Sequence, residues 1–196
     1  MSPKLTFAQM TTPGGHLCGE VTSALQKSIR RGHERDALYW VSELDAAGFG
    51  NYAWKRLRLI ASEDVGIADS NVAVQVRALY ENWKETVRDP KVRWPRLFLV
   101  HATLILVRAP KSRIVDHAAM LAYDGGQEWR DVPDYALDRH TRRGRRLGRG
   151  IEHFFDVGAR LVGEALDDPY RDEARALKTG AELPDDEQLE LDEPPS

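Results

Sequence analysis

The chain has 196 residues, of which 42% are hydrophobic and 30% charged, and its formal net charge at pH 7 is −3. These proportions are ordinary for a soluble globular protein of one domain, with or without appendages. The slightly negative charge excludes a simple polycation, so any contact with nucleic acid must be local. Cys18 is the only cysteine, which excludes an intramolecular disulfide and suits a reducing cytosol.

Neither the start of the chain nor its most apolar run predicts contact with a membrane. The first ten residues lack the apolar core of a signal peptide, and residues 97–107 are too few to span a bilayer. We therefore expect a cytoplasmic protein with no membrane partner. Residues 1–19 are predicted to form an irregular lead-in. Residues 181–196 are acidic, contain proline and have few apolar side chains, so a disordered tail is predicted there.

Hydrophobic side chains recur at helical spacing through most of residues 20–180, which we expect to form one helical domain. No stretch alternates with the period of a strand, so the predicted fold is all-α, an irregular multi-helix bundle. Helices are expected at residues 20–31, 37–47, 51–63, 70–88, 95–108, 110–122, 135–143, 151–166 and 170–178.

Two of these helices carry specific expectations about burial. Residues 95–108 are apolar on nearly every face, which predicts a helix in the middle of the bundle, with a buried strand as the alternative. The next helix should have Pro110 in its first turn, where proline fits well. Its side chains Ile114, Ala118 and Leu121 are expected to point inward.

Residues 37–69 are the most specific stretch, reading ALYWVSELDAAGFGNYAWKRLRLIASEDVGIAD. Gly48 and Gly50 separate two amphipathic helices, of which the second has a basic outer face, and Gly66 ends the second. A short motif, APKS, follows at residues 109–112. Within the two motifs we single out Ser62, Glu63, Asp64, Gly66, Asp69, Pro110, Lys111 and Ser112.

Found in this order, the motifs resemble the C-terminal helical region of the replication-associated recombination AAA+ ATPases, the RarA/MgsA family related to clamp loaders. The resemblance covers about residues 20–122 and leaves residues 123–180 as a basic loop and C-terminal helices. It implies a collar-like helical domain that mediates oligomer assembly. The implied partners are further copies of the chain and a separate AAA+ ATPase or another replication protein.

The sequence carries no signature of nucleotide hydrolysis. The pattern G-x-x-x-x-G-K-[ST] does not occur, so the chain offers no loop of backbone amides to cradle a triphosphate. We therefore expect a non-enzymatic module with no catalytic residue, no cofactor and no metal site. One hypothesis for the adjacent acids Glu63 and Asp64 is that they position a basic partner or a metal, but adjacent helical residues point in different directions. The simpler expectation is that Lys55, Arg56 or Arg58 neutralises them.

A second informative stretch, RHTRRGRRLGRG, spans residues 139–150 and is called the arginine run below. Arginine forks match phosphate oxygens, and glycines let backbone amides approach an anion. A helix starting near residue 151 would direct its positive N-terminal end to the same place. The arginines predicted to bind phosphate or nucleic acid, DNA in particular, are Arg139, Arg142, Arg143, Arg145, Arg146 and Arg149.

Two alternatives to DNA binding remain for the arginine run. It can be a solvated basic loop that pairs with the protein's own acids, especially Asp185, Asp186 and Glu187 of the tail. It can also belong to a small phosphate- or nucleotide-handling enzyme, in which His140 or His153 would serve as acid or base.

Overall fold

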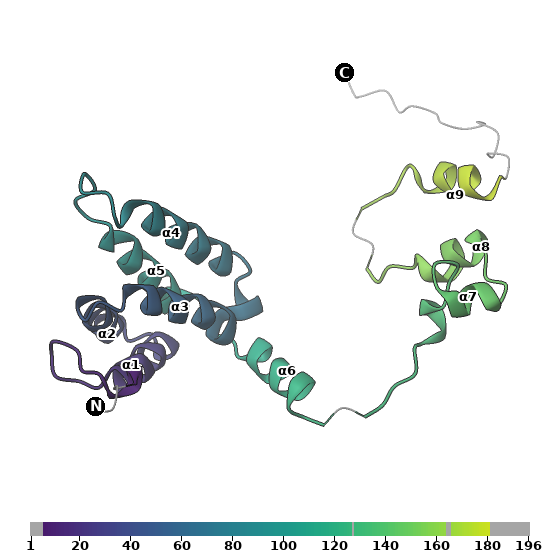
Figure 1. Ribbon diagram of the computed structural model, residues 1–196. Coiled ribbons are helices and arrows are strands. Elements are labelled where there is room, and N and C mark those ends of the chain that lie inside the picture. Colours follow the sequence, from purple (N-terminus) through teal and green to yellow (C-terminus); the bar gives the residue numbers. More distant parts are fainter. Residues whose placement is uncertain (1–5, 127, 164–165, 181–196) are drawn as a thin grey trace, which may run out of the picture. The chain divides into compact units, whose positions relative to one another are not determined.

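A computed structural model describes residues 6–126, 128–163 and 166–180, which form helices joined by loops (Figure 1). No strand occurs in these three ranges, whose one extended pairing is an isolated antiparallel bridge between Thr11 and Leu17. The predicted all-α fold is therefore confirmed. The chain divides into two compact units, Met1–Gln127 and Glu128–Ser196. The predicted disordered tail, residues 181–196, lies outside the described residues.

The first unit is a helical bundle around one hydrophobic core. Its core includes Leu25, Leu44, Trp54, Ile60 and Leu106. The helices in chain order are α1 (Cys18–Arg31), α2 (Glu34–Ala46), α3 (Gly50–Ile60), α4 (Val72–Thr86), α5 (Arg96–Arg108) and α6 (Ile114–Tyr123). Three shorter elements accompany them: the 3-10 turn η1 (Phe7–Gln9) before α1, and the π-helical turn η2 (Ala61–Val65) and 3-10 turn η3 (Gly66–Ala68) between α3 and α4.

The last two helices of this unit differ in how they are covered. α5 packs against α1, α2, α3 and α4, as expected of a central helix, although Leu97 near its start is exposed. α6 contacts η2 and η3 and leads away from the bundle (Figure 1). The predictions for α6 are wrong in two respects. It begins at Ile114 rather than Pro110, and Ile114 and Leu121 are exposed rather than inward.

The second unit consists of short elements. They are η4 (Asp134–Ala136), α7 (Arg142–Arg146), α8 (Ile151–His153), the π-helical turn η5 (Phe154–Gly158) and α9 (Arg171–Thr179). The predicted helix at 135–143 is wrong, because η4 and α7 form instead. The predicted long helix at 151–166 ends at Gly158, and Leu161 and Val162 beyond it are exposed. Glycine disfavours a helix by about 1 kcal/mol relative to alanine, and this segment contains Gly158 and Gly163.

Among the described residues, no helix combines the length and the apolar character needed to cross a membrane.

Candidate functional site

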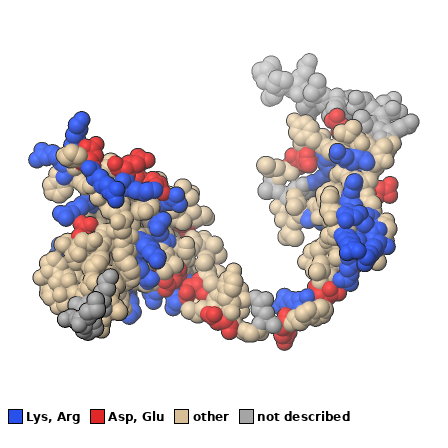
Figure 2. Space-filling view, in the orientation of Figure 1, with Lys and Arg blue, Asp and Glu red and all other residues tan. Residues whose placement is uncertain are grey.

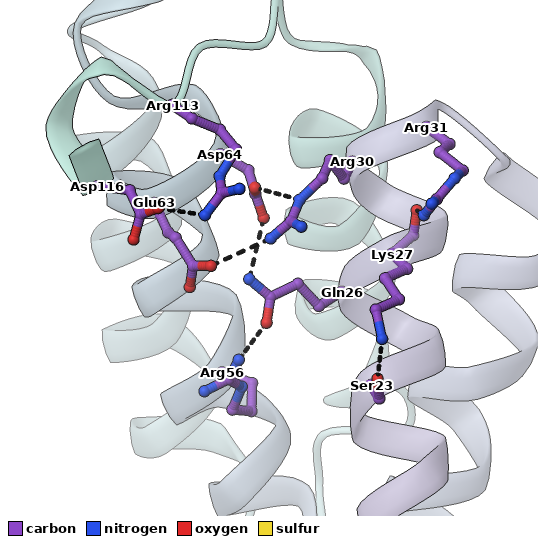
Figure 3. A network of polar contacts seen from close by, with 10 residues as sticks. All are labelled: Ser23, Gln26, Lys27, Arg30, Arg31, Arg56, Glu63, Asp64, Arg113 and Asp116. Carbon is purple, nitrogen blue, oxygen red and sulfur yellow. Dashed lines mark hydrogen bonds and ion pairs between the residues drawn. The ribbon is translucent and has the colours of Figure 1, made fainter. Parts of the chain in front are cut away.

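The two sequence motifs meet in a buried polar cluster in the first unit, which we call the motif junction (Figure 3). At its centre is Asp64, whose side chain is fully buried in η2. Its Oδ1 accepts a hydrogen bond of 2.6 Å from Nε of Arg30, and its Oδ2 accepts one of 3.1 Å from Nε2 of Gln26. Arg30 also pairs with Glu63, at 3.1 Å between Nη2 and Oε1. The hydrogen bond to Asp64 raises the pKa of the Arg30 guanidinium, so this cation stays charged inside the junction.

The partner of the two acids therefore differs from the expected one. Lys55, Arg56 and Arg58 were expected to neutralise them, but Arg30 of α1 does so. The cause is η2, since a π-helical turn contains more residues per turn than an α-helix and changes the direction in which the acids project. Arg56 instead donates a hydrogen bond to Oε1 of Gln26 (Figure 3).

The APKS motif reaches the same junction from the loop between α5 and α6. The backbone N–H of Ser112 donates to the carbonyl oxygen of Asp64 at 2.9 Å, which brings the two motifs together. Nζ of Lys111 donates to the carbonyl oxygens of Val107 and Ala109, at 2.8 and 2.5 Å, and so caps the end of α5. Burial lowers the pKa of Lys111, while the charge of Asp64 acts in the opposite direction.

Other motif residues shape the backbone around the junction. Gly66 has a φ of 53°, and a Cβ atom on it would lie 2.7 Å from Cγ2 of Val115. Both the conformation and the space therefore require glycine. Asp69 accepts a hydrogen bond of 3.0 Å from the backbone N–H of Asn71 and so forms the turn before α4. Ser62 and Pro110 are exposed and take no part in the buried contacts.

The arginine run lies in the second unit, where Figure 2 shows Lys and Arg side chains gathered over α7. The run was expected to be a basic loop after a helix at 135–143, but residues 142–146 form the helix α7 instead. The side chain of Thr141 caps this helix by accepting from the N–H of Gly144 at 3.0 Å. A Cβ on Gly144 would lie 1.9 Å from the carbonyl oxygen of Asp138, so only glycine lets α7 approach this backbone.

Three arginines of the run are held by contacts within the unit. Nη1 of Arg143 pairs with Asp131 at 3.0 Å. Nη1 of Arg145 donates to the carbonyl oxygens of Arg139 and His140, each at 3.1 Å. Arg149 donates to the carbonyl oxygens of Asp134 and Leu137 at 2.7 and 2.9 Å, and to the Asp134 carboxylate at 2.5 Å.

The other three arginines of the run, Arg139, Arg142 and Arg146, are exposed, and their side chains make no hydrogen bond or ion pair among the described residues. The six candidates thus divide into three that hold the fold of the run and three that are available to a ligand. The sequence alone does not distinguish these two groups of arginines.

A histidine and an acid pair beside the run. Nδ1 of His140 lies 2.9 Å from Oδ2 of Asp138, and this hydrogen bond lowers the pKa of Asp138. The helix expected to direct its N-terminal end at the run is only α8, three residues long, continued by η5. A pocket of about 410 Å³ in this unit is lined by Phe155, Tyr170 and neighbouring residues rather than by the run.

Within the described ranges, no three or more His, Cys, Asp or Glu side chains come together as a potential metal site.

Sequence reasoning missed Arg30 and Gln26 as members of the motif junction. A signal was present, because residues four apart on a helix share one face, and both lie in the amphipathic stretch of α1. The identity of their partner could not be read from that spacing, since the contact with Asp64 spans 34 and 38 residues of sequence.

Comparison with known proteins gives a consistent result. The family described as "MgsA AAA+ ATPase C terminal" matches residues 32–164. Replication-associated recombination protein A of Bacillus subtilis is 33% identical over 162 residues, which cover 78% of this chain and 36% of the relative. The protein of the same name from Haemophilus influenzae is 34% identical over 140 residues, or 68% of this chain and 30% of the relative. ATPase WRNIP1 of Dictyostelium discoideum is 27% identical over 167 residues, which cover 82% of this chain and 19% of the relative.

The chain thus spans about a third or less of the length of these relatives. The matched residues extend beyond the resemblance seen in the sequence, which ended near residue 122. They include the arginine run.

Proposed function

Because this chain belongs to the MgsA AAA+ ATPase C-terminal family, we propose that it is a non-enzymatic interaction module that associates with further copies of itself and contacts DNA through the arginine run. A separate AAA+ ATPase or another replication protein is its further partner, in the cytoplasm. The single observation that carries this proposal is the exposed apolar surface of α6.

α6 is apolar but has no buried residue. Its exposed side chains include Ile114, Met120, Leu121 and Tyr123, with 74% of Leu121 exposed. Contiguous exposed apolar patches on a soluble protein mark interaction sites. Ile114 and Leu121 are seven residues apart, so they lie on one face and form a seam that a second α6 can pack against.

Self-association is tested by light scattering of the full chain at increasing concentration. We expect oligomers for the natural sequence, and monomers for Leu121→Glu, because a charge in the seam cannot be buried without a partner. Val74→Glu is the matched control, since Val74 is similarly exposed but lies on α4. A natural chain that stays monomeric at high micromolar concentration contradicts the proposal, as does equal dissociation of both variants.

DNA contact through the run is supported by three of its arginines, which are exposed and pair with no other described residue: Arg139, Arg142 and Arg146. A triple variant Arg139→Ala, Arg142→Ala, Arg146→Ala removes the three available guanidinium groups and leaves the internal contacts of the unit. We expect weaker binding to every DNA sequence alike, because phosphate contacts carry no base information. The dependence of affinity on salt should also become less steep, since fewer counterions are released.

Fluorescence anisotropy with labelled DNA at two salt concentrations measures this effect. If the acidic tail competes for the same arginines, a chain that ends at Gly180 should bind more tightly. Indistinguishable curves for the natural chain and the triple variant would remove DNA binding by the run and leave self-association.

The second candidate function, a small phosphate-handling enzyme, is favoured by one observation, the Asp138–His140 pair beside the run. A carboxylate that holds Nδ1 leaves Nε2 of the histidine available for proton transfer. Under the main proposal, the purified chain should hydrolyse neither ATP nor a phosphodiester above background. Turnover that is abolished by His140→Gln would instead establish the enzyme.

A further inference from the structure

The outer face of α3 carries a groove of about 450 Å³ that the proposed function does not use. The groove is lined by Tyr52, Lys55, Arg56, Arg58, Leu59 and Ser62. Three of these six residues are cations and none is an acid. The groove belongs to the first unit, and the arginine run belongs to the second.

Two of the cations are held in place before any ligand arrives. Arg56 donates to Gln26 of α1, and the guanidinium carbon of Arg58 lies 4.3 Å from the centre of the Tyr80 ring of α4. The Nε atoms of both arginines are buried and have no hydrogen-bond partner among the described residues. The contacts with Gln26 and Tyr80 therefore fix the position of each guanidinium, whereas the covered Nε atoms are not themselves presented to the groove.

Lys55, in contrast, is exposed and makes no ion pair or hydrogen bond among the described residues. Lys27 of α1, next to Gln26, is also exposed and donates a hydrogen bond to Ser23 (Figure 3). The charge of the groove is complementary to phosphate.

The groove also offers apolar side chains between the cations. Tyr52 precedes Lys55 by three residues and Arg56 by four, and Leu59 follows them by four and three residues. The four side chains therefore form one stripe about 10 Å long on the helix. Tyr52 is partly buried, with its ring packed against Phe7 at 4.1 Å between ring centroids, and Leu59 is 48% exposed. An aromatic ring beside cations is the arrangement on which unpaired bases stack while the phosphates meet positive charge.

We propose that the outer face of α3 binds single-stranded nucleic acid, with phosphates at Lys55 and Arg56 and a base against Tyr52 and Leu59. An acidic protein segment also complements the charge, but it does not use the aromatic surface. A double helix hides the faces of its bases and cannot use it either.

The proposal is tested by fluorescence anisotropy with a labelled oligothymidylate. The protein is the full chain that carries the triple variant Arg139→Ala, Arg142→Ala, Arg146→Ala. In this background, Lys55→Glu should weaken binding about tenfold or more, and the slope of log affinity against log salt should fall by about 0.7. Lys91→Glu is the matched control, because Lys91 is an exposed lysine on the loop before α5. Tyr52→Leu should weaken binding about fivefold or more, because a stacked base contributes that much.

Circular dichroism of each variant checks that the bundle is folded. Equal effects of Lys55→Glu and Lys91→Glu overturn the proposal, and so does a duplex that binds as tightly as the single strand. It is also overturned if an acidic peptide binds the groove and the oligonucleotide does not. Because the three available arginines of the run are already replaced in this background, failure here leaves the proposed function of the run unaffected.

Discussion

The motif junction and the arginine run both concentrate charge, but they place it in opposite environments. In the junction, Asp64 is fully buried and its carboxylate is satisfied by Arg30 and Gln26. In the run, the arginines are largely exposed, and Arg142 and Arg146 have no partner among the described residues. A buried charge without a partner is costly, whereas an exposed charge remains solvated. The buried acid of the junction therefore depends on its partners, whereas the three unpaired arginines of the run remain solvated without any.

The difference changes how the motifs are interpreted. The stretch ASEDVGIAD, one of the two motifs that carry the resemblance, contributes the buried part of the junction and joins α1, α3 and the loop after α5. The surfaces that we propose for binding are instead the run, α6 and the outer face of α3. A motif that is specific in sequence is thus not by itself evidence of a binding site.

The largest effect should follow from Asp64→Ala. The variant leaves Arg30, whose side chain is 28% exposed, with Glu63 alone, and it leaves Nε2 of the buried Gln26 without its acceptor. Removing one partner of a fully buried pair costs about 3–5 kcal/mol. Because Arg30 is partly exposed, we expect a loss near the lower end of that range. Urea unfolding followed by tryptophan fluorescence measures the loss, since Trp54 is in the core. Glu63→Ala is the control, and it should cost about 1 kcal/mol or less because Glu63 is partly exposed. If both variants lose the same free energy of unfolding, burial does not decide how much each acid contributes to stability.

An intermediate effect is expected in the second unit from Gly144→Ala. The new Cβ would meet the backbone of Asp138, which cannot move as a flexible side chain can, so α7 must shift. Such steric conflicts typically cost about 1–3 kcal/mol. Gly150→Ala is the matched control, because no atom lies within 4 Å of its added Cβ and its φ is −93°. Amide hydrogen exchange should speed up around α7 in the first variant only, and identical exchange in both would contradict the close approach.

The elements of the first unit could largely be predicted from the sequence, because helical periodicity and glycine stops are local signals. α1 to α5 lie close to their predicted ranges. The failures have physical causes that no local pattern carries. α6 was expected to bury one face, yet no described residue of the first unit covers Ile114 and Leu121. The π-helical turn redirected Glu63 and Asp64 toward a helix more than 30 residues away.

The second unit was predicted less well, because its helices are too short for a periodicity argument. Its fold depends on hydrogen bonds from arginine side chains to backbone carbonyls, as with Arg145 and Arg149. Composition alone identified the run as a phosphate-binding candidate. Only the contacts distinguish Arg143, which is paired, from its neighbour Arg142, which is not.

The smallest effect on stability should follow from Arg143→Ala, which tests the exposed charges of the arginine run. The guanidinium of Arg143 donates to Asp131 and holds the pKa of that carboxyl below its ordinary value of 3.8. Because the pKa of Asp131 is lower in the folded unit, its ionised carboxylate stabilises the fold at pH values above the pKa of the unfolded chain. The contribution is lost as the pH falls through the lowered value.

In Arg143→Ala, the pKa of Asp131 should therefore rise toward 3.8, which NMR of the carboxyl carbon measures directly. Urea unfolding curves of the variant and the natural chain at pH 7 should nevertheless superimpose, because both side chains are more than half exposed and solvent screens the pair. Arg145→Ala is the control, since Arg145 donates to carbonyl oxygens and should leave the Asp131 titration unchanged. A loss of stability comparable with that of Asp64→Ala would mean that the run, like the motif junction, serves mainly to hold the fold together, and its arginines would then be poor candidates for binding DNA.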